Sequence, residues 1–168
     1  MAVRIHCEMI KKETAINFAD LEIAIKTYNR NALVCGAPAW RYVYHTIHSA
    51  DKWYIDPFVF EEPSFHEDEM DDPDRGCKTV LSDEQLLEYL YKVREKIFAY
   101  LDGLDDNLLY ACPEKCPWSR LQLILKQFRH FSLHVGMLNG QTIERTGRFP
   151  KIVGPDGEFD ASGKLFEN

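Results

Sequence analysis

Residues 82–102 run SDEQLLEYLYKVREKIFAYLD, and this stretch decides the fold class more clearly than any other part of the chain. Its apolar residues recur every three or four positions, which gives a helix one continuous apolar face. Ser82 and Gln85 have the spacing of an N-terminal capping box, and Gly103 supplies a stop. We therefore predict an α-helix over residues 83–102.

The same periodicity marks two further helices. Residues 117–140 carry apolar residues at helical spacing, and Pro117 suits the first position of a helix. Residues 38–54 show a similar pattern, which the Asp56-Pro57 pair then breaks. We predict a helix over each range.

The first part of the chain is less regular. Residues 12–30 suit an amphipathic helix, although apolar residues in this range also alternate with polar ones as they would in a strand. A helix is favoured because the other predicted helices need a helical neighbour to bury their apolar faces. The prediction is an all-α four-helix bundle in one domain over residues 1–168, with its core in 12–145 and an irregular tail over 146–168.

Composition and charge limit the function classes. The chain has 168 residues, 45% of them hydrophobic and 28% charged, which is ordinary for a globular domain. Its net charge is -7 and its pI about 5.4. Lysines and arginines are not gathered into a stripe that could neutralise phosphates, so a nucleic-acid partner is not expected. No apolar run approaches the roughly 20 residues that cross a bilayer, and the first residues lack the apolar core of a signal peptide. We expect a cytoplasmic protein with neither a nucleic-acid nor a membrane partner.

The cysteines do not form the pattern of a disulfide framework, because their number is odd and their positions are scattered. They are Cys7, Cys35, Cys77, Cys112 and Cys116. Cys112 and Cys116 form a C-x3-C pair, but structural zinc normally has four ligands and no second cysteine pair completes the set. We expect reduced thiols.

Histidine spacing is the clearest functional signal. His130 and His134 are four residues apart in a predicted helix, so both rings lie on one face and within reach of one metal ion. A third ligand must come from another helix, and residues 38–54 offer His45 and His48. Spacing alone leaves open whether this is a metal site or an ordinary pair of polar residues.

The segment HSAD at 48–51, followed by Trp53, and the segment HFSLHVG at 130–136 together resemble the DinB/YfiT-like family. Members of that family have an H-x-A-D-type segment on the second helix and an H-x3-H segment on the last long helix, and the agreement covers about residues 12–145. The resemblance implies a four-helix bundle with a divalent metal held at one end by three histidines. Carried over by position, these ligands are His48, His130 and His134.

The chain departs from the family pattern in three respects. It has an extra His45, a long acidic insertion after the second helix, and Met137-Leu138 where many relatives have a polar residue. His45 could be a fourth ligand, a proton shuttle or a bystander; we favour the bystander, so His48→Ala should weaken metal binding more than His45→Ala. Asp51 either orients an imidazole or is a solvated surface acid.

Three imidazoles without an evident fourth protein ligand describe an open metal site of the kind that holds water or substrate. Imidazole suits several ions, so zinc is our first expectation and nickel the second.

Characterised relatives include thiol-dependent transferases and isomerases. The resemblance therefore implies that the metal activates a low-molecular-weight thiol for transfer to a small electrophile. The alternatives are a metal-dependent hydrolase that activates water and a non-catalytic metal-binding stress-response protein. The sequence identifies no catalytic side chain. A homodimer is the one assembly that we consider for this chain.

Residues 56–81 form a long, acidic connection that contains prolines. A connection of this length is unusual in a compact domain and is more typical of a lid or a mobile loop. His48 precedes it by only a few residues. We therefore expect the connection to cover or border the metal-bearing end.

Overall fold

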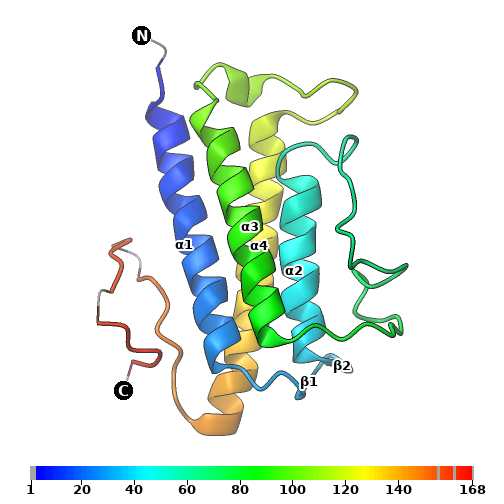
Figure 1. Ribbon diagram of the computed structural model, residues 1–168. Helices are drawn as coiled ribbons and strands as arrows, with labels where there is room; N and C mark the ends of the chain where they lie inside the picture. Colours follow the sequence, from blue (N-terminus) through cyan, green and yellow to red (C-terminus); the bar gives the residue numbers. More distant parts are fainter. Residues whose placement is uncertain (1–2, 155, 161, 168) are drawn as a thin grey trace.

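Four long helices dominate the computed structural model, which describes residues 3–154, 156–160 and 162–167 (Figure 1). The predicted helical class is confirmed, with a two-stranded hairpin and a short 3₁₀ helix added. Positions 155, 161 and 168 of the expected irregular tail lie outside the described residues. The elements are α1 (Ile5–Thr27), β1 (Leu33–Val34), β2 (Ala37–Pro38), α2 (Ala39–Trp53), α3 (Asp83–Asp102), η1 (Leu108–Tyr110) and α4 (Arg120–Thr146).

The helices form a bundle in which α1 and α2 each pack against both α3 and α4. In Figure 1, α2 and α3 run in the same direction, so the chain must return along α2 before α3 can begin. The 15 residues of α2 correspond to a length of about 22 Å. Residues 54–82, which we call the crossover connection, make this return beside α2. Two parallel neighbouring helices therefore explain why the connection is long.

α3 has the bounds that its sequence predicts, because both of its ends carry local signals. Ser82 accepts a hydrogen bond from the backbone N–H of Gln85 at 3.3 Å, and the Gln85 side chain accepts one from the backbone N–H of Ser82 at 2.8 Å. These are the two bonds of a capping box. Gly103 follows directly as the C-cap.

α4 differs from its predicted range at both ends. It begins after Ser119, which forms a second capping box with Gln122, rather than at Pro117. It then passes through Gly140 and stops at Gly147, whose φ of 68° is the left-handed conformation common after a helix. A glycine inside a helix costs only about 1 kcal/mol, which packing of the surrounding turns can offset.

We expect Ser119→Ala to lower the free energy of unfolding by about 1 kcal/mol, because the first turn of α4 loses its side-chain acceptor. Ser132→Ala is the matched control: Ser132 is exposed within the same helix, and its hydroxyl donates to the Phe128 carbonyl at 2.9 Å rather than capping a helix end. That variant should stay within about 0.5 kcal/mol of the natural protein. Urea unfolding of both variants measures the difference, and equal stabilities would contradict the capping role.

α1 begins at Ile5, several residues before the predicted start at residue 12. Its first N–H groups have a distant acceptor: the Asp106 carboxylate accepts from His6 N at 3.1 Å and from Cys7 N at 3.0 Å. The cap lies 100 residues from His6 in the sequence. No local pattern could therefore indicate this helix start.

The β1–β2 hairpin is a further element that the sequence analysis did not predict. Its turn is formed by Cys35 and Gly36, with φ angles of 47° and 91°. Tight hairpin turns often need positive φ at both central residues, and Asn-Gly or Asp-Gly are the usual sequences. Here Cys35 takes the place of the usual Asn or Asp, so the sequence of this turn did not indicate a hairpin.

All five cysteines are free thiols, as predicted. Cys7 and Cys116 are buried, whereas Cys35 and Cys112 are exposed. Burial, together with the nearby Asp106 carboxylate, raises the pKa of Cys7 to about 11. This thiol is therefore protonated at neutral pH and is a poor nucleophile.

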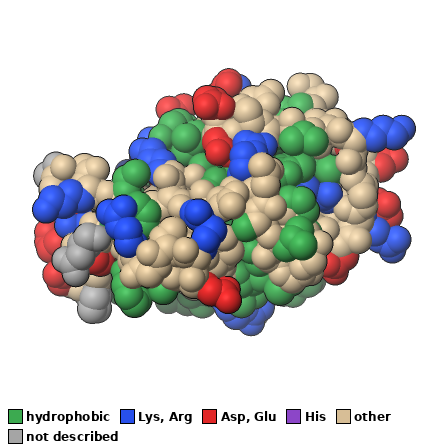
Figure 2. Space-filling view, turned by 90° about the horizontal axis from the view of Figure 1, so that it is seen from below, with side chains coloured by type: hydrophobic (Ala, Val, Ile, Leu, Met, Phe, Trp, Pro, Cys, Tyr) green, Lys and Arg blue, Asp and Glu red, His purple; other side chains and the backbone are tan. Residues whose placement is uncertain are grey.

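The surface seen from the hairpin end mixes both signs of charge (Figure 2). Lysine and arginine side chains are scattered there among acidic and apolar ones, without a continuous basic stripe on this face. Within the described part of the chain, no helix has the length and apolar character needed to cross a membrane.

Candidate metal centre

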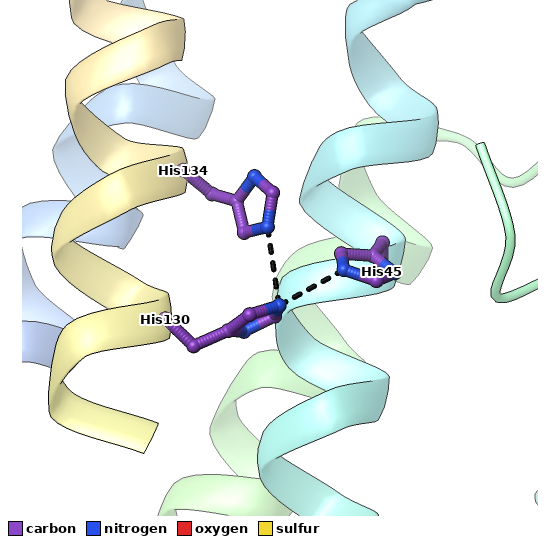
Figure 3. Close-up of side chains that lie close together, drawn as sticks. All are labelled: His45, His130 and His134. Atoms are coloured by element: carbon purple, nitrogen blue, oxygen red, sulfur yellow. Dashed lines mark hydrogen bonds between the residues drawn. The ribbon is translucent and has the colours of Figure 1, made fainter. Parts of the chain in front are cut away.

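Three imidazole rings converge between α2 and α4 (Figure 3). His45 comes from α2, and His130 and His134 come from successive turns of α4. The Nε2 atom of His130 lies 2.9 Å from Nε2 of His45 and 3.1 Å from Nε2 of His134. Two nitrogens bound tetrahedrally to one zinc ion are about 3.3 Å apart. These three residues, which we call the triad, therefore have nearly the dimensions of a metal site.

The triad cannot satisfy its own hydrogen bonds while its rings are neutral. His45 Nδ1 lies 2.6 Å from the backbone carbonyl oxygen of Asp71, which can only accept, so the proton of His45 is on Nδ1 and Nε2 keeps a lone pair. His130 Nε2 can then donate a proton to His45 or accept one from His134, but not both. One of the two close N–N contacts always lacks a proton. A cation between the rings would accept a lone pair from each.

Burial keeps the two rings on α4 neutral. Desolvation is the main cause that lowers the pKa of His130 to about 3, and the neighbouring His134, His45 and Arg129 act in the same direction. Desolvation, followed by His45, lowers the pKa of His134 to about 4. Both rings are therefore unprotonated near pH 7, which is the form that binds metal.

The crossover connection orients His45, and Arg41 holds that connection in place. Arg41 is 5% exposed, and its guanidinium donates to four backbone carbonyls of the connection at 2.7 to 3.5 Å. These are the carbonyls of Glu69, Met70, Asp72 and Arg75. The Asp71 carbonyl is thereby fixed beside His45 Nδ1, in the manner of the oxygen partners that orient metal-binding histidines. The connection borders the triad, as expected.

His48 does not join the histidines of α4. A step of three residues leaves His45 and His48 about 60° apart around the axis of α2 and about 4.5 Å apart along it, and with this offset the two rings meet different neighbours. His45 faces α4, whereas His48 faces the crossover connection, where its Nε2 lies 2.5 Å from Glu62 Oε2. Of the expected ligands His48, His130 and His134, the structure brings together only the last two, and His45 supplies the third imidazole.

The triad also lies in the middle of the bundle rather than at the end that the resemblance implied. His45 is the seventh of 15 residues in α2, and His130 is the eleventh of 27 in α4. Because α2 and α4 pack side by side, their central turns face one another there. The site is therefore walled by helices as well as by the crossover connection.

Asp51 has neither of the two roles considered for it. Its carboxylate accepts hydrogen bonds from Tyr89 Oη at 2.9 Å and from Lys96 Nζ at 2.5 Å, both on α3. Its side chain is only 11% exposed. Asp51 therefore joins α2 to α3 and does not orient an imidazole of the triad.

The sequence did not indicate a role for Arg41, Glu62 or His66. Arg41 binds the crossover connection, and Glu62 lies close to both His48 and His66. Glu62 and His66 are four residues apart, but this spacing indicates a shared face only in a helix, and their segment is not helical. Arg41 is indistinguishable in the sequence from a surface arginine. Only the three-dimensional path of the crossover connection brings Glu62 and His66 beside α2, and only that path covers Arg41, which lies on α2 itself.

Comparison with known proteins produced no match, whether with family models, curated proteins or solved structures.

Proposed function

We propose that this chain is a metalloprotein in which His45, His130 and His134 hold one divalent ion, and that the ion activates a low-molecular-weight thiol for transfer to a small electrophile. Zinc is the first choice of ion and nickel the second, since imidazole binds both. His45 takes the position that the DinB/YfiT-like resemblance gave to His48.

One observation carries the metal-binding proposal: the Nε2 atom of His130 lies close to the Nε2 atoms of both other rings, but the neutral rings have too few protons for a hydrogen bond in each contact. His45 cannot donate from Nε2 because its Nδ1 proton is committed to the Asp71 carbonyl. His134 is buried and His130 half-buried, and the lowered pKa of each ring keeps it neutral at pH 7. Nitrogen lone pairs that face one another repel, and a divalent cation turns this repulsion into three favourable contacts.

The number of ligands supports a reactive site rather than a purely structural one. Structural zinc usually has four protein ligands, whereas catalytic zinc keeps one position for water or substrate. When bound in such a site, a divalent ion lowers the pKa of a coordinated thiol or water and so supplies a nucleophile at neutral pH. The choice of a thiol over water follows the family resemblance.

The proposal requires that an added thiol reach the metal. In the Co²⁺-loaded protein, glutathione should produce a new near-ultraviolet sulfur-to-cobalt charge-transfer absorption, because thiolate would fill the position left open by three imidazoles. Glutathione alkylated on sulfur is the matched control and should produce none. A spectrum unchanged by free thiol would contradict thiol activation and leave the two alternatives, a hydrolase that activates water and a metal-binding protein without turnover.

A further inference from the structure

A second cluster of metal-ligating side chains lies where α2 meets the crossover connection. His48 Nε2 is 2.5 Å from Glu62 Oε2, and His66 Nε2 is 3.7 Å from the same oxygen. The two rings are stacked, with centroids 4.8 Å apart and an angle of 12° between their planes. Both Nε2 atoms therefore face one carboxylate, and the ligand atoms of all three residues lie within 4.8 Å of one another.

Each ring in this cluster also has an oxygen atom near its other nitrogen. Tyr44 Oη lies 2.6 Å from His66 Nδ1, and Asp71 Oδ2 lies 3.8 Å from His48 Nδ1. Histidines that bind metal through Nε2 commonly direct Nδ1–H to a carboxylate or another oxygen, which fixes the ring and its tautomer. His66 therefore has the outer hydrogen-bond partner of a metal-binding histidine, and the Asp71 carboxylate lies near the corresponding nitrogen of His48.

We propose that His48, Glu62 and His66 bind a second divalent cation, separate from the ion of the triad. Two imidazoles and one carboxylate are a ligand set that suits zinc and also ferrous iron, and they leave positions for water. His48 is 1% exposed, whereas the Glu62 side chain is 41% exposed. The cation would enter from the Glu62 side.

The positive charge of Lys52 does not occupy the proposed position. Lys52 Nζ lies 3.2 Å from Oε1 of Glu62, the oxygen that does not contact the imidazoles, and 5.6 Å from the centre of the Phe60 ring. Lys52 therefore holds one carboxylate oxygen, which leaves Oε2 directed between His48 and His66.

The second site would tie the crossover connection to α2. Glu62 and His66 belong to the connection, and His48 belongs to α2. Asp71 lies between the two clusters, because its carbonyl oxygen accepts from His45 and its carboxylate faces His48. A cation at the second site would therefore stabilise the segment that orients a ligand of the first.

Equilibrium dialysis against Zn²⁺ with elemental analysis tests this proposal on the full chain without a polyhistidine tag, because a tag would itself bind zinc. The natural chain should bind two ions. Glu62→Gln and His66→Ala should each bind one, with affinity for the lost ion reduced by more than about 100-fold. Glu61→Gln, which removes the same charge from the neighbouring residue, should still bind two. Glu62→Gln keeps the size of the side chain, so its helical circular dichroism should be unchanged.

The two sites fail in distinguishable ways. One ion per natural chain that is lost in His130→Ala but kept in Glu62→Gln and His66→Ala would overturn the second site and leave the proposed function standing. One ion that is lost in His66→Ala but kept in His130→Ala would support the second site and contradict the proposed function.

Discussion

His130→Ala should lower the affinity of the triad for zinc by more than about 100-fold. His130 is the central member of the triad, since its Nε2 contacts the Nε2 atoms of both other rings. Loss of a direct ligand should exceed the roughly 10 to 100-fold cost of removing an outer partner. Competition with a chelator of known zinc affinity at pH 7 measures the change. His6→Ala is the matched control, because His6 is 54% exposed and lies beside Asp106 at the start of α1.

The same assay separates His45 from His48. His45→Ala should resemble His130→Ala, because both remove a ring from the triad. His48→Ala should leave the triad's ion bound, since the His48 ring faces Glu62 and His66. A chain that loses its triad ion in His48→Ala and keeps it in His45→Ala would show that the third imidazole has been assigned to the wrong histidine.

Phe131→Ala should lower the free energy of unfolding by about 3–5 kcal/mol, the usual cost of deleting a buried phenylalanine ring. Phe131 is 1% exposed, and its ring centroid lies 5.2 Å from that of Phe18 on α1. The substitution therefore removes an aromatic contact and leaves a cavity between α1 and α4. Denaturant unfolding monitored by circular dichroism measures the loss.

Leu133→Ala is the control for this prediction, because Leu133 lies two residues further along the same helix and is 58% exposed. Its effect should stay within about 0.5 kcal/mol. Similar losses in the two variants would contradict the orientation of α4, in which Phe131 faces the core while His130 and His134 face α2. The fold and the site depend on the same rotation of this helix.

Local sequence signals predicted the helix ends only in part. The ends of α4 also carry local signals, the Ser119–Gln122 capping box and Gly147, but its predicted range ran from Pro117 to Gly140. Ser82, Gln85 and Gly103 gave α3 its observed bounds. The start of α1 was missed because Asp106, its cap, lies 100 residues away from His6. A local pattern records propensity and capping within a few residues, and it carries no information on a partner supplied by tertiary packing.

The same limit explains the part of the site that the sequence did not predict. The i, i+4 spacing of His130 and His134 requires only one helix, so it was sufficient to place both rings together. The choice between His45 and His48 depends on the rotation of α2 against α4. That rotation is set by packing and by the crossover connection, which Arg41 fixes through four backbone carbonyls.

A crystal structure of the zinc-loaded chain, with anomalous diffraction recorded on both sides of the zinc absorption edge, tests the central claim most directly. We predict an anomalous peak between the Nε2 atoms of His45, His130 and His134, at about 2.0–2.1 Å from each. Absence of a peak between these three rings at saturating zinc would contradict the claim, whatever density appears at His48.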